Sequence, residues 1–262
     1  MKIKQVTNFL ENIAPLEYQE NYDNCGLIVG DAKSEVKGAL ITLDCTEAVI
    51  DEAIATGCNL VIAHHPIIFS GLKKVNGSNY IERTVIKAIK NDIAIYAIHT
   101  NLDNVHNGVN AKIAEKLGLI NCKVLALKQE VNLDLVGSGI IGELKTPVNT
   151  KVFLESLKTK MQTKCIRHTL IVKEKIQRVA VCGGSGSFLL KNAKAAKADV
   201  FITADFKYHE FFDAENKIVI ADIGHYESEQ FTKDLIYDLL VKNFTKFAVR
   251  LSKVNTNPIK YL

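Results

Sequence analysis

The sequence has no hydrophobic run long enough to cross a membrane and no long run of basic residues. Its apolar stretches fall short of the roughly 18 residues that a membrane-spanning helix requires. The net charge is +4, from 33 basic and 29 acidic residues, which gives no support for nucleic-acid binding. Residues 1–18 lack the apolar core and small-residue cleavage site of a secretory signal peptide. We therefore expect a cytoplasmic protein with no membrane partner.

Several common chemistries are also missing. The six cysteines are scattered and form no C-x-x-C pair, so we expect reduced thiols rather than disulfides or a thiolate zinc site. There is no G-x-S-x-G nucleophile elbow, no P-loop with its lysine and no complete G-x-G-x-x-G fingerprint. We therefore expect histidine and carboxylate side chains to carry the chemistry of this chain.

The order of apolar and amphipathic stretches predicts an α/β fold. After a predicted helix at residues 3–14, ended by Pro15, three nearly continuous apolar runs alternate with three amphipathic stretches. Apolar runs of this kind are typical of strands covered by helices on both faces. The runs are GALITLD (38–44), NLVIAHH (59–65) and IAIYAIHT (93–100).

Part of this order recurs 140 residues later. ALITLD, from Ala39, matches VAVCGG, from Val179, and NLVIAHH, from Asn59, matches DVFITAD, from Asp199. The matched spacing predicts two similar α/β lobes with mixed sheets flanked by helices. We place the first lobe at residues 1–126, with 246–262 able to complete it, and the second at 127–245. The alternative is that any two strand–helix–strand units look alike.

Histidines and acids follow three of the predicted strands. His64 and His65 come directly after NLVIA, His99 comes directly after IAIYAI, and His225 follows KIVIADIG. In open α/β sheets, ligands gather beyond the carboxyl ends of the strands. We therefore expect these strand ends to deliver their side chains to the zone where a site would form.

The spacings at these strand ends suit two metal ions. His225 and Glu229, at i and i+4 on a helix that GHYESE begins, share one face and can reach one metal centre. Adjacent side chains diverge, so His64 and His65 suit two ions roughly 3.5–4 Å apart. Asp103 would bind one of the ions, and Glu229 could bridge them.

Other residues carry weaker signals. His99 and His209 are candidates for orienting a ligand or carrying a proton in catalysis, whereas His106 and His168 fit ordinary surface or turn positions. GGSGS, from Gly183, is either a phosphate-binding loop or a tight turn. YDNCGLIVGD, from Tyr22, reads as a turn and a short strand.

Six motifs in order resemble the Nif-three-like dinuclear-metal family, also called GTP cyclohydrolase 1 type 2 homologues. They span residues from about 20 to 235: NYDNCGLIVGD, NLVIAHHPIIF, AIHTNLDNVHNGVN, VAVCGGSG, DVFITADFKYHE and IADIGHYESE. The chain is similar in length to members without an inserted domain. Two departures are Thr203-Ala204-Asp205, where members often have Thr-Gly-Asp or Thr-Gly-Glu, and Cys25, where many have an aliphatic residue.

The resemblance implies a function as well as a fold. It places metal ligands at the five positions selected above: His64, His65, Asp103, His225 and Glu229. It also implies two similar lobes with the metal site in the cleft between them, a ring-shaped homohexamer and a nucleotide such as GTP as substrate. The expected function is a metal-dependent hydrolase using two Zn²⁺, Fe²⁺ or Mn²⁺ ions. The alternatives are a phosphoesterase and a non-enzymatic metal-binding, metal-delivery or scaffold protein.

Overall fold

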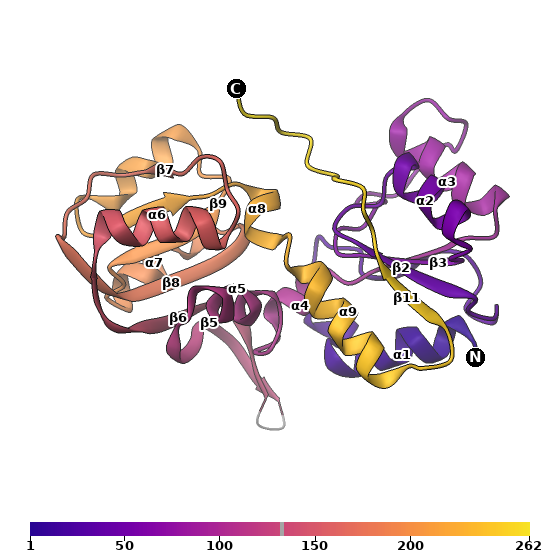
Figure 1. Cartoon of the computed structure of the whole chain (residues 1–262), viewed down its shortest axis with the longest axis horizontal. Helices are drawn as coiled ribbons and strands as arrows, with labels where there is room; N and C mark the ends of the chain where they lie inside the picture. Colours follow the sequence, from indigo (N-terminus) through magenta and orange to yellow (C-terminus); the bar gives the residue numbers. More distant parts are fainter. Residues whose placement is uncertain (132–133) are drawn as a thin grey trace. The chain divides into compact units, whose positions relative to one another are not determined.

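The computed structural model describes residues 1–131 and 134–262, which form two compact units (Figure 1). Unit 1 comprises residues 1–102 and 232–258, and unit 2 comprises residues 103–231 and 259–262. These divisions differ from the boundaries expected after residues 126 and 245. Helix α5 (Val109–Leu117) packs on strand β8 of unit 2, and helix α9 (Thr232–Asn243) packs on strands β2 and β11 of unit 1.

Unit 1 is a five-stranded mixed sheet between two layers of helices. The strand order is β1-β4-β3-β2-β11, and only β1 runs antiparallel to its neighbour. Helices α2 and α3 cover one face of the sheet, and α1 and α9 cover the other (Figure 1). The strands are β1 (Gly26–Val29), β2 (Gly38–Thr42), β3 (Leu60–Ala63), β4 (Ala94–Ala97) and β11 (Ala248–Leu251). The other elements are α1 (Ile3–Ile13), η1 (Leu16–Tyr18), α2 (Glu47–Thr56) and α3 (Tyr80–Lys90), with α4 (Thr100–Asn104) crossing into unit 2.

Helices on both faces explain why the central strands of unit 1 are apolar throughout. All residues of β2, β3 and β4 are buried. Helix α2 begins after Thr46, whose hydroxyl accepts a hydrogen bond from the Val49 amide, and ends at Gly57 in the left-handed conformation. The predicted first helix is confirmed, because α1 ends two residues before Pro15.

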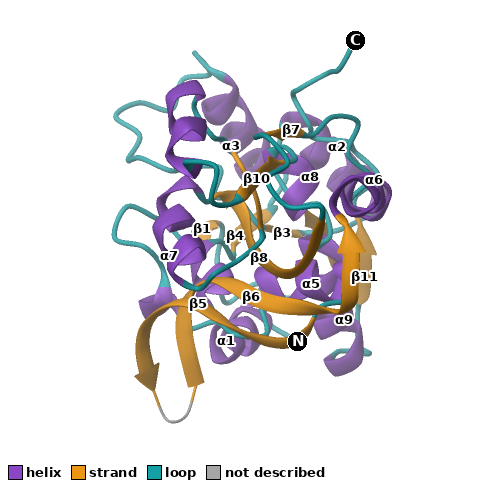
Figure 2. Cartoon of the chain, turned by 90° about the vertical axis from the view of Figure 1, so that its left-hand side faces the viewer, coloured by secondary structure: helices purple, strands orange, loops and turns teal. Residues whose placement is uncertain are grey.

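Unit 2 is a six-stranded mixed sheet in the order β5-β6-β8-β9-β10-β7. Strands β8, β9 and β10 are parallel, whereas β5 and β6 pair antiparallel as a long hairpin (Figure 2). The strands are β5 (Ile120–Val131), β6 (Asp134–Asn149), β7 (Arg167–His168), β8 (Lys175–Ser185), β9 (Val200–Ala204) and β10 (Val219–Asp222). The remaining elements are α6 (Thr150–Lys160), η2 (Ser187–Leu189), α7 (Leu190–Ala195), η3 (Tyr208–Ala214) and α8 (His225–Glu229).

The strand registers confirm that the two units share a structural repeat. In unit 1 Ala39 of β2 lies opposite Leu60 of β3, and in unit 2 Val179 of β8 lies opposite Val200 of β9. Both members of the second pair are displaced by the same 140 residues from the first. The third parallel strand, β4 or β10, then joins the same side of β3 or β9.

A hydrogen bond before the second strand of each repeat is also repeated. The Asn59 side chain accepts from the Lys37 amide at 2.8 Å, and the Asp199 side chain accepts from the Gln177 amide at 2.9 Å. The predicted fold of two similar α/β lobes with mixed sheets is therefore confirmed. All six cysteines are free thiols. Within the described residues, no helix has the length and apolar character needed to span a membrane.

Candidate metal centre

Three histidines gather at one edge of the unit 1 sheet. His64 and His65 directly follow β3, and His99 follows β4. Because β3 and β4 are parallel neighbours, their carboxyl ends lie at the same edge. The ring centroids are 4.9 Å apart for His64 and His65, 5.1 Å for His64 and His99, and 5.2 Å for His65 and His99. One ring nitrogen from each imidazole lies within 4.8 Å of the others, a spacing that could hold a metal ion.

Each of these imidazoles has its Nδ1 atom bonded to an oxygen that only accepts hydrogen bonds. His64 Nδ1 donates to the Ile98 carbonyl at 2.8 Å, His65 Nδ1 to Asp44 Oδ1 at 2.7 Å, and His99 Nδ1 to Asp23 Oδ1 at 2.8 Å. With the hydrogen on Nδ1, a neutral ring carries its lone pair on Nε2. Such partners orient histidine ligands in metal sites. In the neutral form each of the three rings therefore presents Nε2 as a lone pair that can bind a metal ion or accept a proton.

The buried Asp23 carboxylate orients the His99 ring through a hydrogen bond. Its side chain is fully buried and also accepts from the Asn24 and Thr100 amides, at 2.8 and 3.0 Å, and from the Thr100 hydroxyl. Burial alone would raise the pKa of Asp23, but the hydrogen bonds and charge of His99 and the bonds from Thr100 and Asn24 outweigh it. The pKa of Asp23 lies well below its usual range, so this carboxylate is ionised and fixes the His99 ring.

Unit 2 carries a second group of potential ligands on the short helix α8. His225 Nε2 lies 3.1 Å from Glu229 Oε2, which confirms the contact predicted from their i, i+4 spacing. His225 Nδ1 lies 2.6 Å from Asp205 Oδ2, at the end of β9. Burial lowers the pKa of His225, but the Glu229 charge and the hydrogen bonds to Asp205 and Glu229 raise it to about 11. These carboxylates thus favour positive charge at His225.

Asp103 belongs to the same unit as His225 and Glu229. It is the penultimate residue of α4 and is half-buried, and its backbone carbonyl accepts from the Asn110 side chain at 3.1 Å. A carboxylate oxygen of Asp103 lies within 4.8 Å of one of Glu229. Burial and the charges of both carboxylates raise the pKa of the Cys182 thiol in β8. The two predicted carboxylate ligands of unit 2 therefore lie together.

The glycine-rich segment after β8 makes room for Glu229. Gly184 has φ +59°, and a Cβ atom there would collide with Glu229 Oε1. The Gly183 and Gly184 amides donate to Asn110 Oδ1 at 3.0 Å and Ser228 Oγ at 2.9 Å. Because protein side chains already use these two amides, the arrangement favours the tight-turn interpretation over a phosphate loop.

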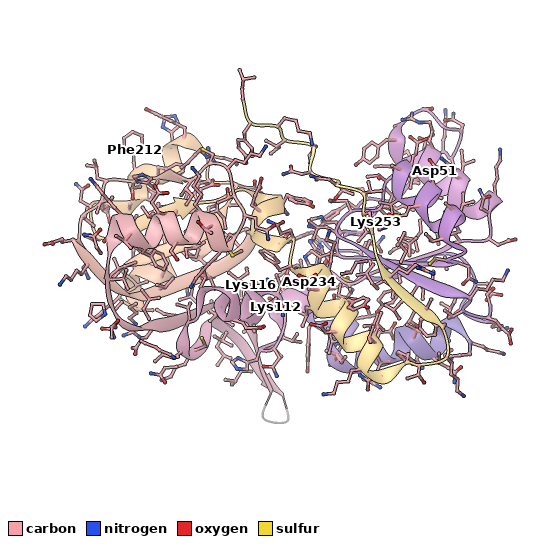
Figure 3. The ribbon with its side chains drawn as sticks, in the orientation of Figure 1. Asp51, Lys112, Lys116, Phe212, Asp234 and Lys253 are labelled. Carbon is pink, nitrogen blue, oxygen red and sulfur yellow. The ribbon has the colours of Figure 1, made fainter. Side chains whose placement is uncertain are left out.

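The remaining histidines lie elsewhere. His106 and His168 are exposed, and His168 Nδ1 bonds to the Thr169 carbonyl at 2.8 Å. His209 is exposed on η3, with its ring centroid 5.2 Å from that of Tyr208 and 6.3 Å from that of Phe212. Phe212 itself points outwards from the surface of unit 2 (Figure 3). Of the two predicted proton carriers, His99 lies beside the predicted ligands His64 and His65 of unit 1. His209 lies on the exposed surface of unit 2.

Sequence reasoning missed the three carboxylates that orient the imidazoles. Asp44 and Asp205 each follow a strand, at the ends of GALITLD and DVFITAD, so the rule that selected the histidines also applied to them. Asp205 is the last residue of the Thr203-Ala204-Asp205 segment, one of the two departures from the family pattern. In the structure Asp205 is bonded to His225.

A family model described as Duf34/NIF3 (NGG1p interacting factor 3) matches residues 1–258. The chain belongs to this family. The DUF34/NIF3 relatives include a GTP cyclohydrolase 1 type 2 homolog of Clostridium acetobutylicum, 35% identical over 87% of this chain and 85% of the relative. One from Campylobacter jejuni is 32% identical, with both chains fully covered. One from Staphylococcus epidermidis is 28% identical over 366 positions, so it carries internal residues that this DUF34/NIF3 chain of 262 lacks.

Solved structures of DUF34/NIF3 relatives show the same fold. A hypothetical protein of Staphylococcus aureus is 30% identical with a TM-score of 0.92, covering 100% of this chain and 99% of that one. Reduced HcgD from Methanocaldococcus jannaschii is 29% identical with a TM-score of 0.79, covering 97% and 98%. The similarity extends over both units.

Proposed function

We propose that this DUF34/NIF3 protein binds two divalent metal ions through His64, His65, Asp103, His225 and Glu229. The observation that carries the proposal is the shared arrangement of the histidines. Each of the three histidine ligands has its Nδ1 atom bonded to an oxygen acceptor, which directs Nε2 towards a ligand.

The donor chemistry fits a mid-series divalent cation. Imidazole nitrogens and carboxylate oxygens suit Zn²⁺, Fe²⁺ or Mn²⁺, and no thiolate is among the five ligands. His64 and His65 point their Nδ1 atoms to different acceptors, the Ile98 carbonyl and Asp44, so their rings are tilted by 46°. This difference supports assigning the two rings to different ions.

We further propose that the protein is a hydrolase of a nucleotide-like substrate. Bound divalent ions supply Lewis acidity and a water of lowered pKa. His99, held by Asp23 and 12% exposed at its side chain, is the proton carrier next to His64 and His65. His209, being exposed, would exchange protons near the solvent. The relatives are named GTP cyclohydrolase 1 type 2 homologs, which makes GTP the substrate to test first.

The cyclohydrolase and phosphoesterase versions make different products. In the first, water adds to C8 of guanine and opens the imidazole ring, and a second water hydrolyses the resulting formamide to release formate. In the second, water displaces a phosphate group. Incubating the metal-loaded protein with GTP, with separate assays for formate and inorganic phosphate, distinguishes the two. Release of phosphate without formate would reject the cyclohydrolase version.

A non-enzymatic metal carrier is the second candidate. The donor set alone supports metal binding without turnover, and such a carrier would exchange its ions readily with a chelator. Turnover of no nucleotide in a broad screen, together with rapid metal exchange, would favour this candidate. We also propose that the protein is cytoplasmic and forms a homohexamer. Sedimentation of the purified protein would test the oligomeric state.

A further inference from the structure

We infer that Thr256 is a positioning residue for His65 and that it acts through Asp44. The inference rests on the proposed metal function, because its consequence is the strength of metal binding at His65. Thr256 lies in the segment after β11, and 212 residues separate it from Asp44 along the chain. All three residues belong to unit 1.

The Asp44 carboxylate joins Thr256 to His65. Thr256 Oγ1 donates to Asp44 Oδ2 at 2.5 Å, and His65 Nδ1 donates to Asp44 Oδ1 at 2.7 Å. A carboxylate held by a donor on each oxygen cannot rotate freely about its terminal bond. The Thr256 hydroxyl therefore fixes the plane of the Asp44 carboxylate and, through it, the orientation of the His65 ring.

Hydrogen bonds and packing fix the segment after β11, which carries Thr256, to the rest of unit 1. Strand β11 pairs in parallel with β2, and the Ser252 amide then donates to the Ile41 carbonyl at 2.8 Å. The Ser252 hydroxyl and the Lys253 amide donate to the two carboxylate oxygens of Glu52, at 2.5 and 2.9 Å. Val254 packs against the apolar core of the unit.

The parallel pairing explains how Thr256 reaches Asp44. Asp44 lies just beyond the end of β2, and Thr256 lies beyond the end of β11, the neighbouring strand. Both residues thus leave the sheet at the edge where His64 and His65 follow β3. Lys253, labelled in Figure 3, lies between the strand and Thr256 and makes its Glu52 contact through the backbone.

The inference is tested by titrating the metal-free full-length protein with Co²⁺, whose absorbance reports the ligand geometry. Thr256→Val removes the hydroxyl and keeps the size of the side chain, whereas Thr256→Ser keeps the hydroxyl. We expect Thr256→Val to weaken one of the Co²⁺ affinities about tenfold and to alter its spectrum, at the lower end of the range for outer-shell partners. Thr256→Ser should restore both. Lys253→Ala, in the same segment, should leave both unchanged.

A double-mutant cycle tests whether Thr256 acts through Asp44. If it does, Thr256→Val in an Asp44→Ala background adds no further loss of affinity. An equal affinity for wild type and Thr256→Val, or an additive loss in the double variant, would overturn the inference and leave the proposed function standing. Failure of the wild type to bind Co²⁺ would overturn the proposed function itself. Should Thr256→Val not fold, Thr256→Ala replaces it in the cycle.

Discussion

His225 Nδ1 lies 2.6 Å from Asp205 Oδ2, so a proposed metal ligand on α8 is oriented by a carboxylate at the end of β9. Asp205 also accepts from the Ser185 hydroxyl at 3.0 Å. Unit 1 contains the same kind of pair in His65 and Asp44. His65 and Asp205 occupy matching places in the 140-residue repeat. At this place unit 1 supplies the histidine of its pair, whereas unit 2 supplies the carboxylate.

The Asp205–His225 pair predicts a defect in metal affinity. Asp205→Ala removes the Nδ1 acceptor, and we expect binding of the ion held by His225 to weaken about 10–100-fold. Isothermal titration of the metal-free protein with Zn²⁺ measures the effect. Asp213→Ala, an exposed position on η3, is the charge-matched control and should bind like the wild type. Equal affinities for both variants would show that Asp205 does not support a ligand.

The close approach of Gly184 to Glu229 predicts a second defect. Gly184→Ala places a methyl group against Glu229 Oε1, so the carboxylate must move, and we expect reduced metal content together with lower stability. Gly57→Ala is the matched control, since Gly57 also has a positive φ, +69°, but open space around it. It should cost about 1–2 kcal/mol from backbone strain alone and keep its metal. Normal metal content in Gly184→Ala would contradict the proposed role of Glu229.

Asp199 predicts how the stability of unit 2 depends on pH. Burial raises its pKa, but bonds from the Gln177 amide, Lys173 and the Arg178 amide outweigh this and lower it below its usual value. A lowered folded-state pKa stabilises the fold above the unfolded value of about 3.9, and this stabilisation is lost as pH falls through the folded value. Asp199→Ala should cost about 1–3 kcal/mol at pH 7.

Urea unfolding at several pH values checks the Asp199 prediction. The difference in unfolding free energy between the wild type and Asp199→Ala should shrink below about pH 3.9. Asp199→Asn should lose less than the alanine variant at pH 7, because Asn59 fills the matching position in unit 1 with an amide. A difference that stays constant down to pH 2 would rule out an ionised Asp199 as the source of the stability.

Replacing His99 is expected to lower turnover without lowering the metal content. His99→Gln should lower the rate on whichever nucleotide the protein hydrolyses by about 10²–10⁴-fold, the usual contribution of a positioned proton carrier. Metal content should stay close to that of the wild type. His209→Gln, on exposed η3, should have a much smaller effect. An equal loss in both variants would remove the distinction between the two histidines.

Local patterns predicted the elements and the contact on α8. The buried strands were visible as apolar runs, and the spacing of His225 and Glu229 was enough to place them on one helical face. Matching segments such as ALITLD and VAVCGG revealed the repeat, because equivalent strands need equivalent apolar residues. Each of these predictions depends on neighbours within a few residues, or on comparing one part of the chain with another.

Relationships between distant residues were not visible in the sequence. Asp23 and His99 are 76 residues apart, and nothing local in the turn-like segment around Asp23 indicates its partner. The division of the chain after residues 102 and 231 was not visible for the same reason. The amphipathic patterns of α5 and α9 show that each helix has a buried face, but they do not show which sheet covers it.

Metal analysis of protein purified without chelator tests the central claim most directly, when the wild type is compared with His65→Ala. We predict about two divalent ions per wild-type chain and a substantial fall in the variant, with the metal-free forms equally folded by circular dichroism. A wild type that carries no divalent metal, or a His65→Ala variant with unchanged metal content, would contradict the account.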